Sequence, residues 1–177
     1  MARILALAGS NSSTSINHAL VVYAAERITG HTVRVRKMAD SDFPMYSEDR
    51  EKASGIPEDI LELYARIRES DALVISVNEH NGNPSAFTKN FLDWLSRHDR
   101  NFLEGLQVFL MSTSPGKRAA QSSHAVIAAM LPRFGADIAA VFSLPAFREN
   151  FKAGEGILNP DLVSEFDSAL HDFLNAL

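Results

Sequence analysis

Hydroxyl and amide side chains crowd the segment GSNSSTSIN, residues 9–17, which follows an apolar run at 3–9 and leads into a helical pattern at 15–29. The N-terminus of a helix carries unpaired N–H groups and the positive end of the helix dipole, so it attracts anions. One or two hydroxyls would be enough to cap the helix. The surplus favours a phosphate site with neutral donors. Neither GxxxxGK[ST] nor GxGxxG is present, which excludes a Walker loop and a dinucleotide fingerprint.

Two more polar segments follow apolar runs further along the chain. VNEHNGNPSAF, residues 77–87, contains Asn81-Gly82, a pair that forms sharp turns and exposes backbone N–H groups. An ordinary strand-to-helix turn is an equally good interpretation of it. MSTSPGKRAAQ, residues 111–121, places hydroxyls ahead of a Pro-Gly turn, and a capped turn with two solvated cations is its alternative. His80 has no second histidine nearby, so we do not expect a metal site.

Five apolar runs alternate with five helical patterns and predict a doubly wound, three-layer α/β fold. Most runs are apolar on both faces, as in a parallel sheet that helices cover on both sides. They occupy 3–9, 32–38, 72–77, 107–113 and 138–144. The second run alternates valine with arginine, which suits an edge strand. The helical patterns occupy 15–29, 57–69, 84–97, 117–133 and 160–177, the fourth with Gly135 as C-terminal cap.

The three polar segments are expected to meet at one site. In an open parallel sheet, ligands bind beyond the carboxyl ends of the strands, and each polar segment follows a predicted strand. A further long polar stretch, residues 38–56, is expected to form a surface loop, and long loops in compact domains are often functional.

The composition fits one domain spanning residues 1–177, with 46% apolar and 22% charged residues. A net charge of −5 without a Lys/Arg cluster argues against a nucleic-acid partner. The absence of cysteine excludes disulfides, thiolate metal sites and cysteine nucleophiles, and it is consistent with the cytoplasm. No apolar run approaches the roughly 20 residues of a membrane span. We therefore expect a cytoplasmic protein without a membrane partner.

The polar segments together resemble the motifs of the NADPH-dependent FMN reductases, a flavodoxin-like family related to quinone, azo-dye and chromate reductases. Residues 9–17 resemble the family's G-S-x-R-x-x-S-x-N motif. NEHNG at 78–82 and KNFLDW at 89–94 resemble its P-E-Y-N-G-(x)n-K-N-x-x-D-W motif. DFPMYSED at 42–49 and STSPGKR at 112–118 are similar to its D-x-P-x-Y and S-x-S-x-G-G stretches.

This resemblance implies a five-stranded parallel sheet with strand order 2-1-3-4-5 and FMN as cofactor. The first segment would hold the phosphate, the second would border the isoalloxazine ring, partly through backbone N–H groups, and the third would approach the flavin. The implied cofactor-binding residues are Ser10, Ser12, Ser15, Ile16, Asn17, Asn78, Glu79, His80, Asn81, Gly82, Ser112, Ser114 and Gly116. The family also implies a homodimer or homotetramer, with Lys89, Asn90, Asp93 and Trp94 in structural or interfacial roles.

Three positions depart from the family pattern. Ser12 stands where the family has arginine, Asn78 replaces proline and His80 replaces tyrosine. Losing a charge-assisted phosphate contact costs about 1.5–3 kcal/mol, or roughly ten- to a hundredfold in affinity. Hydroxyls and the helix dipole offset part of this loss, so FMN is expected to be held loosely.

The implied function is an FMN-dependent NAD(P)H oxidoreductase with a ping-pong mechanism. NADPH or NADH passes hydride to flavin N5 and leaves before a small acceptor (a quinone, free flavin, azo compound or metal oxyanion) takes the electrons. His80 is the one candidate for a catalytic side chain, as a proton donor. The alternatives are a flavin-binding electron carrier and a flavin-free dimeric module. A serine hydrolase using Ser10 or Ser12 is disfavoured, because the late pair His171 and Asp167 belongs to a helix surface.

Overall fold

Five parallel strands form the central sheet of the computed structural model, which describes residues 1–177. They are β1 (Arg3–Ala8), β2 (Thr32–Arg36), β3 (Ala72–Val77), β6 (Gln107–Thr113) and β7 (Asp137–Leu144). Their order across the sheet is β2-β1-β3-β6-β7, with every pair parallel. This is the predicted order 2-1-3-4-5 in another numbering, and the strand with alternating valine and arginine lies at an edge. The predicted fold class is confirmed.

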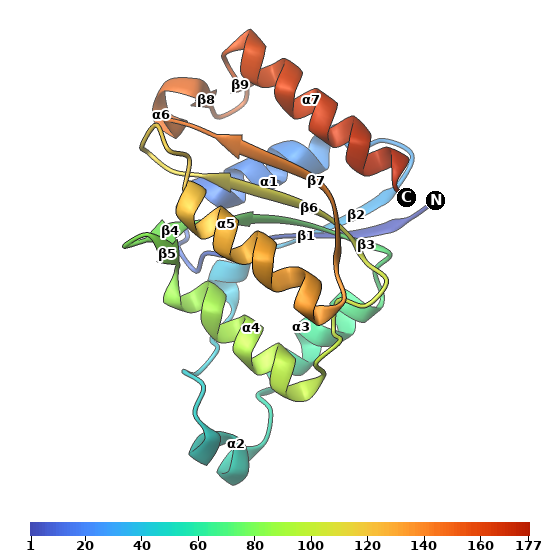
Figure 1. The fold of residues 1–177 in the computed structure, drawn as a ribbon, viewed down its shortest axis with the longest axis vertical. Helices are drawn as coiled ribbons and strands as arrows, with labels where there is room; N and C mark the ends of the chain where they lie inside the picture. The colour runs from blue at the N-terminus through green and yellow to red at the C-terminus, as the bar shows by residue number, and fades with distance from the viewer.

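Helices cover both faces of the sheet (Figure 1). On one face, α1 (Ile16–Arg27) and α7 (Pro160–Asn175) enclose a core with β1, β3, β6 and β7. On the other face, α3 (Glu58–Arg68), α4 (Ala86–His98) and α5 (Gln121–Met130) enclose a second core. The strands alternate side chains between these two cores, because successive residues of a strand point to opposite faces. Strands buried on both faces explain the continuous apolar runs of the sequence.

Helix boundaries follow the local capping residues. Ser15 caps α1 and Ser85 caps α4, each accepting a backbone N–H three residues on at 3.2 Å. The fourth helix starts at Gln121 instead of the predicted residue 117, because Ala119 and Ala120 adopt left-handed backbone angles with φ of 52° and 60°. A short 3₁₀ turn, η2 (Leu131–Phe134), extends it, and Gly135 ends it with φ of 94° as predicted.

The stretch 38–56 is not the plain surface loop that its polarity predicts. It contains a 3₁₀ turn, η1 (Met38–Asp40), and a short helix, α2 (Glu48–Ser54), which projects from the body of the molecule (Figure 1). Ser47 caps α2 by accepting the N–H of Arg50 at 3.2 Å. Trp94 Nε1 donates to the carbonyl of Pro44 at 2.7 Å, and the Asn90 side chain accepts the N–H of Tyr46 at 2.8 Å. Two of the α4 motif residues therefore have structural roles.

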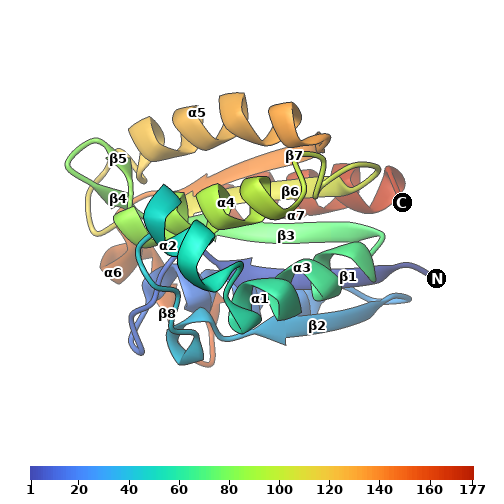
Figure 2. The same ribbon diagram turned by 90° about the horizontal axis from the view of Figure 1, so that it is seen from below.

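Short elements complete the chain: β4 (Glu79–His80), β5 (Asn83–Pro84), α6 (Phe147–Asn150), β8 (Phe151–Lys152) and β9 (Gly156–Ile157). Figure 2 shows the β4–β5 hairpin and α6 at one end of the sheet and both termini at the other. The carboxyl ends of β3 and β6 lie at the same end of the sheet as the β4–β5 hairpin. None of the helices combines the length and the apolar character that crossing a membrane requires.

Candidate functional site

The three polar segments meet at the carboxyl ends of β1, β3 and β6, as the sequence predicts for a parallel sheet. They enclose a pocket of about 230 Å³, here called the strand-end pocket. Its lining residues are Ser10, Ser12, Thr14, Ser15, Ile16, Asn17, Asn78, Glu79, His80, Thr113, Ser114 and Pro115. Nine of the predicted cofactor-binding residues are in this set, and Asn81, Gly82, Ser112 and Gly116 are outside it.

The first segment has hydrogen-bond donors that the chain itself does not use. No hydrogen bond within the chain uses the backbone N–H groups of Ile16 and Asn17, which begin α1. The Ser10 hydroxyl accepts the N–H of Ser12 at 3.3 Å, and the Ser15 hydroxyl accepts an N–H at 3.2 Å. Each hydroxyl has one O–H to donate in addition to accepting, so both remain available as donors. A helix N-terminus with free N–H and O–H groups can hold a phosphate.

Gly9 lets β1 end directly against α4. Its carbonyl accepts the hydroxyls of Ser85 at 3.0 Å and Thr88 at 2.5 Å. A Cβ at position 9 would overlap the Thr88 hydroxyl. Thr88 is fully buried, so it has little room to move. The glycine therefore fixes where the hydroxyl-rich segment leaves the sheet.

The side chain of Asn17 points inward and joins two strands. Its carbonyl oxygen accepts the Ser76 hydroxyl at 2.7 Å and the N–H of Thr113 at 3.2 Å, and its amide donates to the carbonyl of Thr113 at 3.2 Å. Asn17 is 2% exposed. The pocket therefore has access to its backbone N–H, while the amide holds the ends of β3 and β6. Ser76 was missed by sequence reasoning, although a serine inside an apolar run is the signal that marks it.

The Ser112 side chain also bonds within the protein. It is fully buried, and its hydroxyl donates to the carbonyl of Ala119 at 2.7 Å and lies 2.9 Å from the Ser143 hydroxyl. The bond to Ala119 holds Ala119 and Ala120, the two residues with left-handed backbone angles just before α5. Ser114 does line the pocket, and the carbonyl of Gly116 accepts the N–H of Ala146 at 3.0 Å, which ties the third segment to α6.

The second segment forms a tight hairpin. Asn81 and Gly82 both have positive φ, 54° and 74°, as a two-residue type I′ turn between paired strands requires. The turn is exposed, and so is His80, whose Nε2 lies 3.4 Å from the Asn78 amide nitrogen. The Glu79 carboxylate instead turns toward α5, where it accepts two backbone N–H groups.

No lysine or arginine lines the strand-end pocket. Glu79 is its one carboxylate, and the nearest cations in sequence, Lys117 and Arg118, are exposed on the third segment outside the lining. The electrostatics of the pocket are therefore those of neutral donors, one helix N-terminus and the Glu79 carboxylate. Thr14, Thr113 and Pro115 also line it. They lie in the predicted polar segments but are not among the cofactor-binding residues that the resemblance implies.

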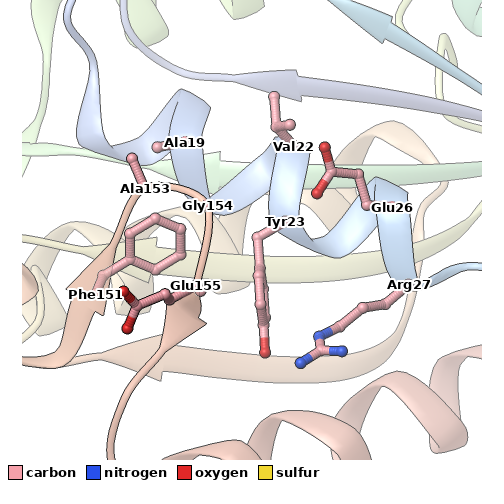
Figure 3. A pocket seen from close by; sticks show the side chains of 10 residues that line it. Ala19, Val22, Tyr23, Glu26, Arg27, Phe151, Ala153, Gly154 and Glu155 are labelled. Carbon is pink, nitrogen blue, oxygen red and sulfur yellow. The ribbon is translucent and has the colours of Figure 1, made fainter.

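A second pocket of about 420 Å³ lies between α1 and the β8–β9 hairpin (Figure 3). Tyr23, Arg27, Phe151 and Glu155 are among its lining residues, and it shares none with the strand-end pocket. The Arg27 guanidinium lies over the Tyr23 ring at 4.3 Å from its centroid. No polar segment that follows a sheet strand in sequence reaches this pocket, so the strand-end pocket is the better candidate.

Fold and site together define a flavodoxin-like α/β protein with free backbone N–H groups at a helix N-terminus beside the switch point of its sheet. The sequence model of the NADPH-dependent FMN reductase family matches residues 2–145, and the chain belongs to this family.

Known relatives agree with this assignment. A quinone reductase of Escherichia coli K12 is 30% identical over 115 residues, which cover 64% of this chain and 61% of that protein. The flavoenzyme NAD(P)H:(acceptor) oxidoreductase FerB from Paracoccus denitrificans has a similar structure, with a TM-score of 0.79, 24% identity and coverage of 99% of this chain and 96% of that one. An azoreductase from Bacillus anthracis superimposes with a TM-score of 0.61 at 13% identity, covering 99% and 98%. These structural similarities establish the fold.

Proposed function

We propose that this chain is an FMN-dependent NAD(P)H oxidoreductase that passes electrons to a small acceptor. The observation that carries the proposal is the strand-end pocket, where the free N–H groups of Ile16 and Asn17 converge with the second and third segments. Family membership supports the same function, as do the activities for which the quinone reductase and FerB are named.

The residues present fit FMN. A phosphate needs several convergent donors, which the start of α1 and the hydroxyls of Ser10 and Ser15 supply. The second segment contributes Asn78, Glu79 and His80 to the wall of the pocket, where the isoalloxazine ring would lie. Asn17 acts through its backbone N–H, and Ser112 acts by holding the third segment. When bound, FMN supplies the hydride and electron transfer of the reaction.

The chain's own residues would bind the cofactor, orient it and shield it. The hydroxyl-rich segment orients the cofactor, and the exposed β4–β5 turn leaves one side of the pocket open to a nicotinamide donor and then to an acceptor. The donor and the acceptor would use this open side one after the other, which corresponds to a ping-pong order. The acceptor would be a quinone, free flavin, azo compound or metal oxyanion. His80, exposed at the rim, can donate a proton to the reduced acceptor. Unchanged turnover of His80→Phe would remove that role.

The proposal includes a homodimer or homotetramer in the cytoplasm, as expected from the resemblance and the composition. Light scattering coupled to size exclusion would measure the mass of the assembly.

The experiment that tests the function is an FMN titration followed by visible absorbance, then NADPH or NADH oxidation with excess quinone. FMN uptake with quinone-dependent turnover supports an enzyme, and parallel double-reciprocal lines support the ping-pong order. Uptake without turnover would identify a flavin-binding electron carrier instead. A chain that never takes up FMN would contradict the proposal.

A further inference from the structure

Glu79 caps α5 from outside the helix. Its carboxylate accepts the backbone N–H groups of Ser122 at 2.9 Å and Ser123 at 3.1 Å. Both belong to the first turn of α5, whose own N-cap residue, Ala120, offers no side-chain acceptor. The first N–H groups of a helix lack partners, and a carboxylate there gains from hydrogen bonds and from the helix dipole. The cap comes from a strand 43 residues earlier in the chain.

A second bond makes this contact a clamp between β4 and α5. The Ser123 hydroxyl, fully buried, donates to the carbonyl of Asn78 at 2.7 Å. The β4–β5 hairpin pairs only two residues on each side, and a ribbon of this size is marginally stable alone. Figures 1 and 2 both place the hairpin beside the start of α5. The position of the hairpin therefore depends on Glu79 and Ser123.

The same contact joins two of the three segments around the pocket. The start of α5 is fixed on its other side by Ser112, which bonds the carbonyl of Ala119. Ala119 and Ala120 hold left-handed angles that alanine rarely adopts, so surrounding contacts must maintain them. Glu79 holds the first turn of the helix that directly follows them. The second and third segments consequently keep a fixed spacing across the pocket.

We propose that Glu79 is a positioning residue of the flavin site, holding the β4–β5 hairpin, with the pocket residues Asn78 and His80, in place through its cap on α5. This inference rests on the proposed function, and it differs from the role that the family resemblance implies, in which Glu79 borders the flavin ring. Its negative charge still stands at the pocket wall, so the residue has a geometric and an electrostatic effect that variants can separate.

Two substitutions at position 79 make that separation. Glu79→Gln keeps an acceptor oxygen and removes the charge. We expect its FMN affinity to stay within about threefold of the unaltered protein, while the midpoint potential of bound FMN becomes more positive, because a negative charge beside the flavin opposes its reduction. Glu79→Ala removes the cap. We expect its FMN affinity to fall about tenfold or more, because the hairpin loses its support.

Ser123→Ala tests the clamp from the side of the helix, without touching a residue that lines the pocket. FMN affinity should fall in the same direction as in Glu79→Ala. Hydrogen exchange of the flavin-free chain gives a readout independent of the cofactor: the amides of residues 122 and 123 should lose protection in Glu79→Ala and keep it in Glu79→Gln.

The matched control is Asp71→Asn, which alters another carboxylate that accepts a backbone N–H, that of Arg3 at 2.8 Å, at the opposite end of the sheet. It should change stability and leave FMN affinity and potential unaltered. The inference is overturned if the unaltered protein binds FMN and Glu79→Ala binds it equally well, with only its melting temperature lowered. Failure of the unaltered protein to bind FMN is a different result, and it overturns the proposed function together with the inference.

Discussion

At the scale of single residues, Ser12 offers a test of the proposed phosphate site. It lines the strand-end pocket, is exposed, and has no cation beside it. A charge-assisted contact is worth about 1.5–3 kcal/mol. Ser12→Arg should therefore raise FMN affinity roughly ten- to a hundredfold and riboflavin affinity hardly at all, as measured by fluorescence titration. Ser13→Arg adds the same charge on the same segment outside the lining, so an equal gain there would contradict this account.

Tyr23 offers a second test at this scale, because its hydroxyl is buried without a hydrogen-bond partner. An unpaired buried polar group costs about 1–3 kcal/mol. Tyr23→Phe should keep or raise the free energy of unfolding, by up to about 1 kcal/mol, in urea denaturation. Tyr64→Phe is the opposite case, because the Tyr64 hydroxyl donates to Asp99 at 3.0 Å, and it should be destabilising. Equal losses in both variants would refute the distinction.

At the scale of elements, Asn17 joins α1 to β3 across 59 residues of sequence and to β6 across 96 residues. Asn17→Ala would leave the Ser76 hydroxyl and both backbone groups of Thr113 unpaired in a buried place. We expect the free energy of unfolding to fall by about 2–4 kcal/mol, measured by chemical denaturation. Asn83→Ala removes only an exposed hydrogen bond of 3.3 Å from the Asn83 side-chain amide to the carbonyl of Asn81. It should change stability by less than about 0.5 kcal/mol. Similar values for the two variants would mean that the Asn17 network contributes little.

At the scale of the whole molecule, two histidines make stability depend on pH. Burial lowers the pKa of His124, partly opposed by the backbone of Leu110, and burial together with Lys37 lowers the pKa of His18, opposed by Asp40. A lowered folded-state pKa means that the unfolded chain takes up protons first, near pH 6.5. Stability from these groups is complete above that pH and is lost as pH falls through it.

The measurement is the free energy of unfolding at pH 7.5 and 5.5. It should be smaller at the lower pH, and His124→Gln should reduce the difference by removing one of the two groups. A His124→Gln protein with the full pH difference would show that other groups cause it.

The sequence by itself determined the five strands of the central sheet, the five long helices and the place where the three polar segments meet. Continuous apolar runs mark strands buried on both faces, and capping residues such as Ser15 and Ser85 mark helix starts; both signals are local. The carboxyl-end rule then placed three polar segments at one pocket. The helix at Glu48–Ser54 was missed because no residue of it is buried, so it leaves no apolar period in the sequence.

Only the tertiary structure decided which polar groups face the pocket and which face the protein. Asn17 and Ser112 lie within motifs that point to a ligand, yet their side chains bond to Thr113 and Ala119. Glu79 belongs to the same motifs and caps a helix that begins 42 residues later, after two left-handed alanines. A motif fixes the type and spacing of side chains. The direction of each side chain depends on partners from distant parts of the chain, because buried polar groups must find hydrogen bonds wherever the fold brings them.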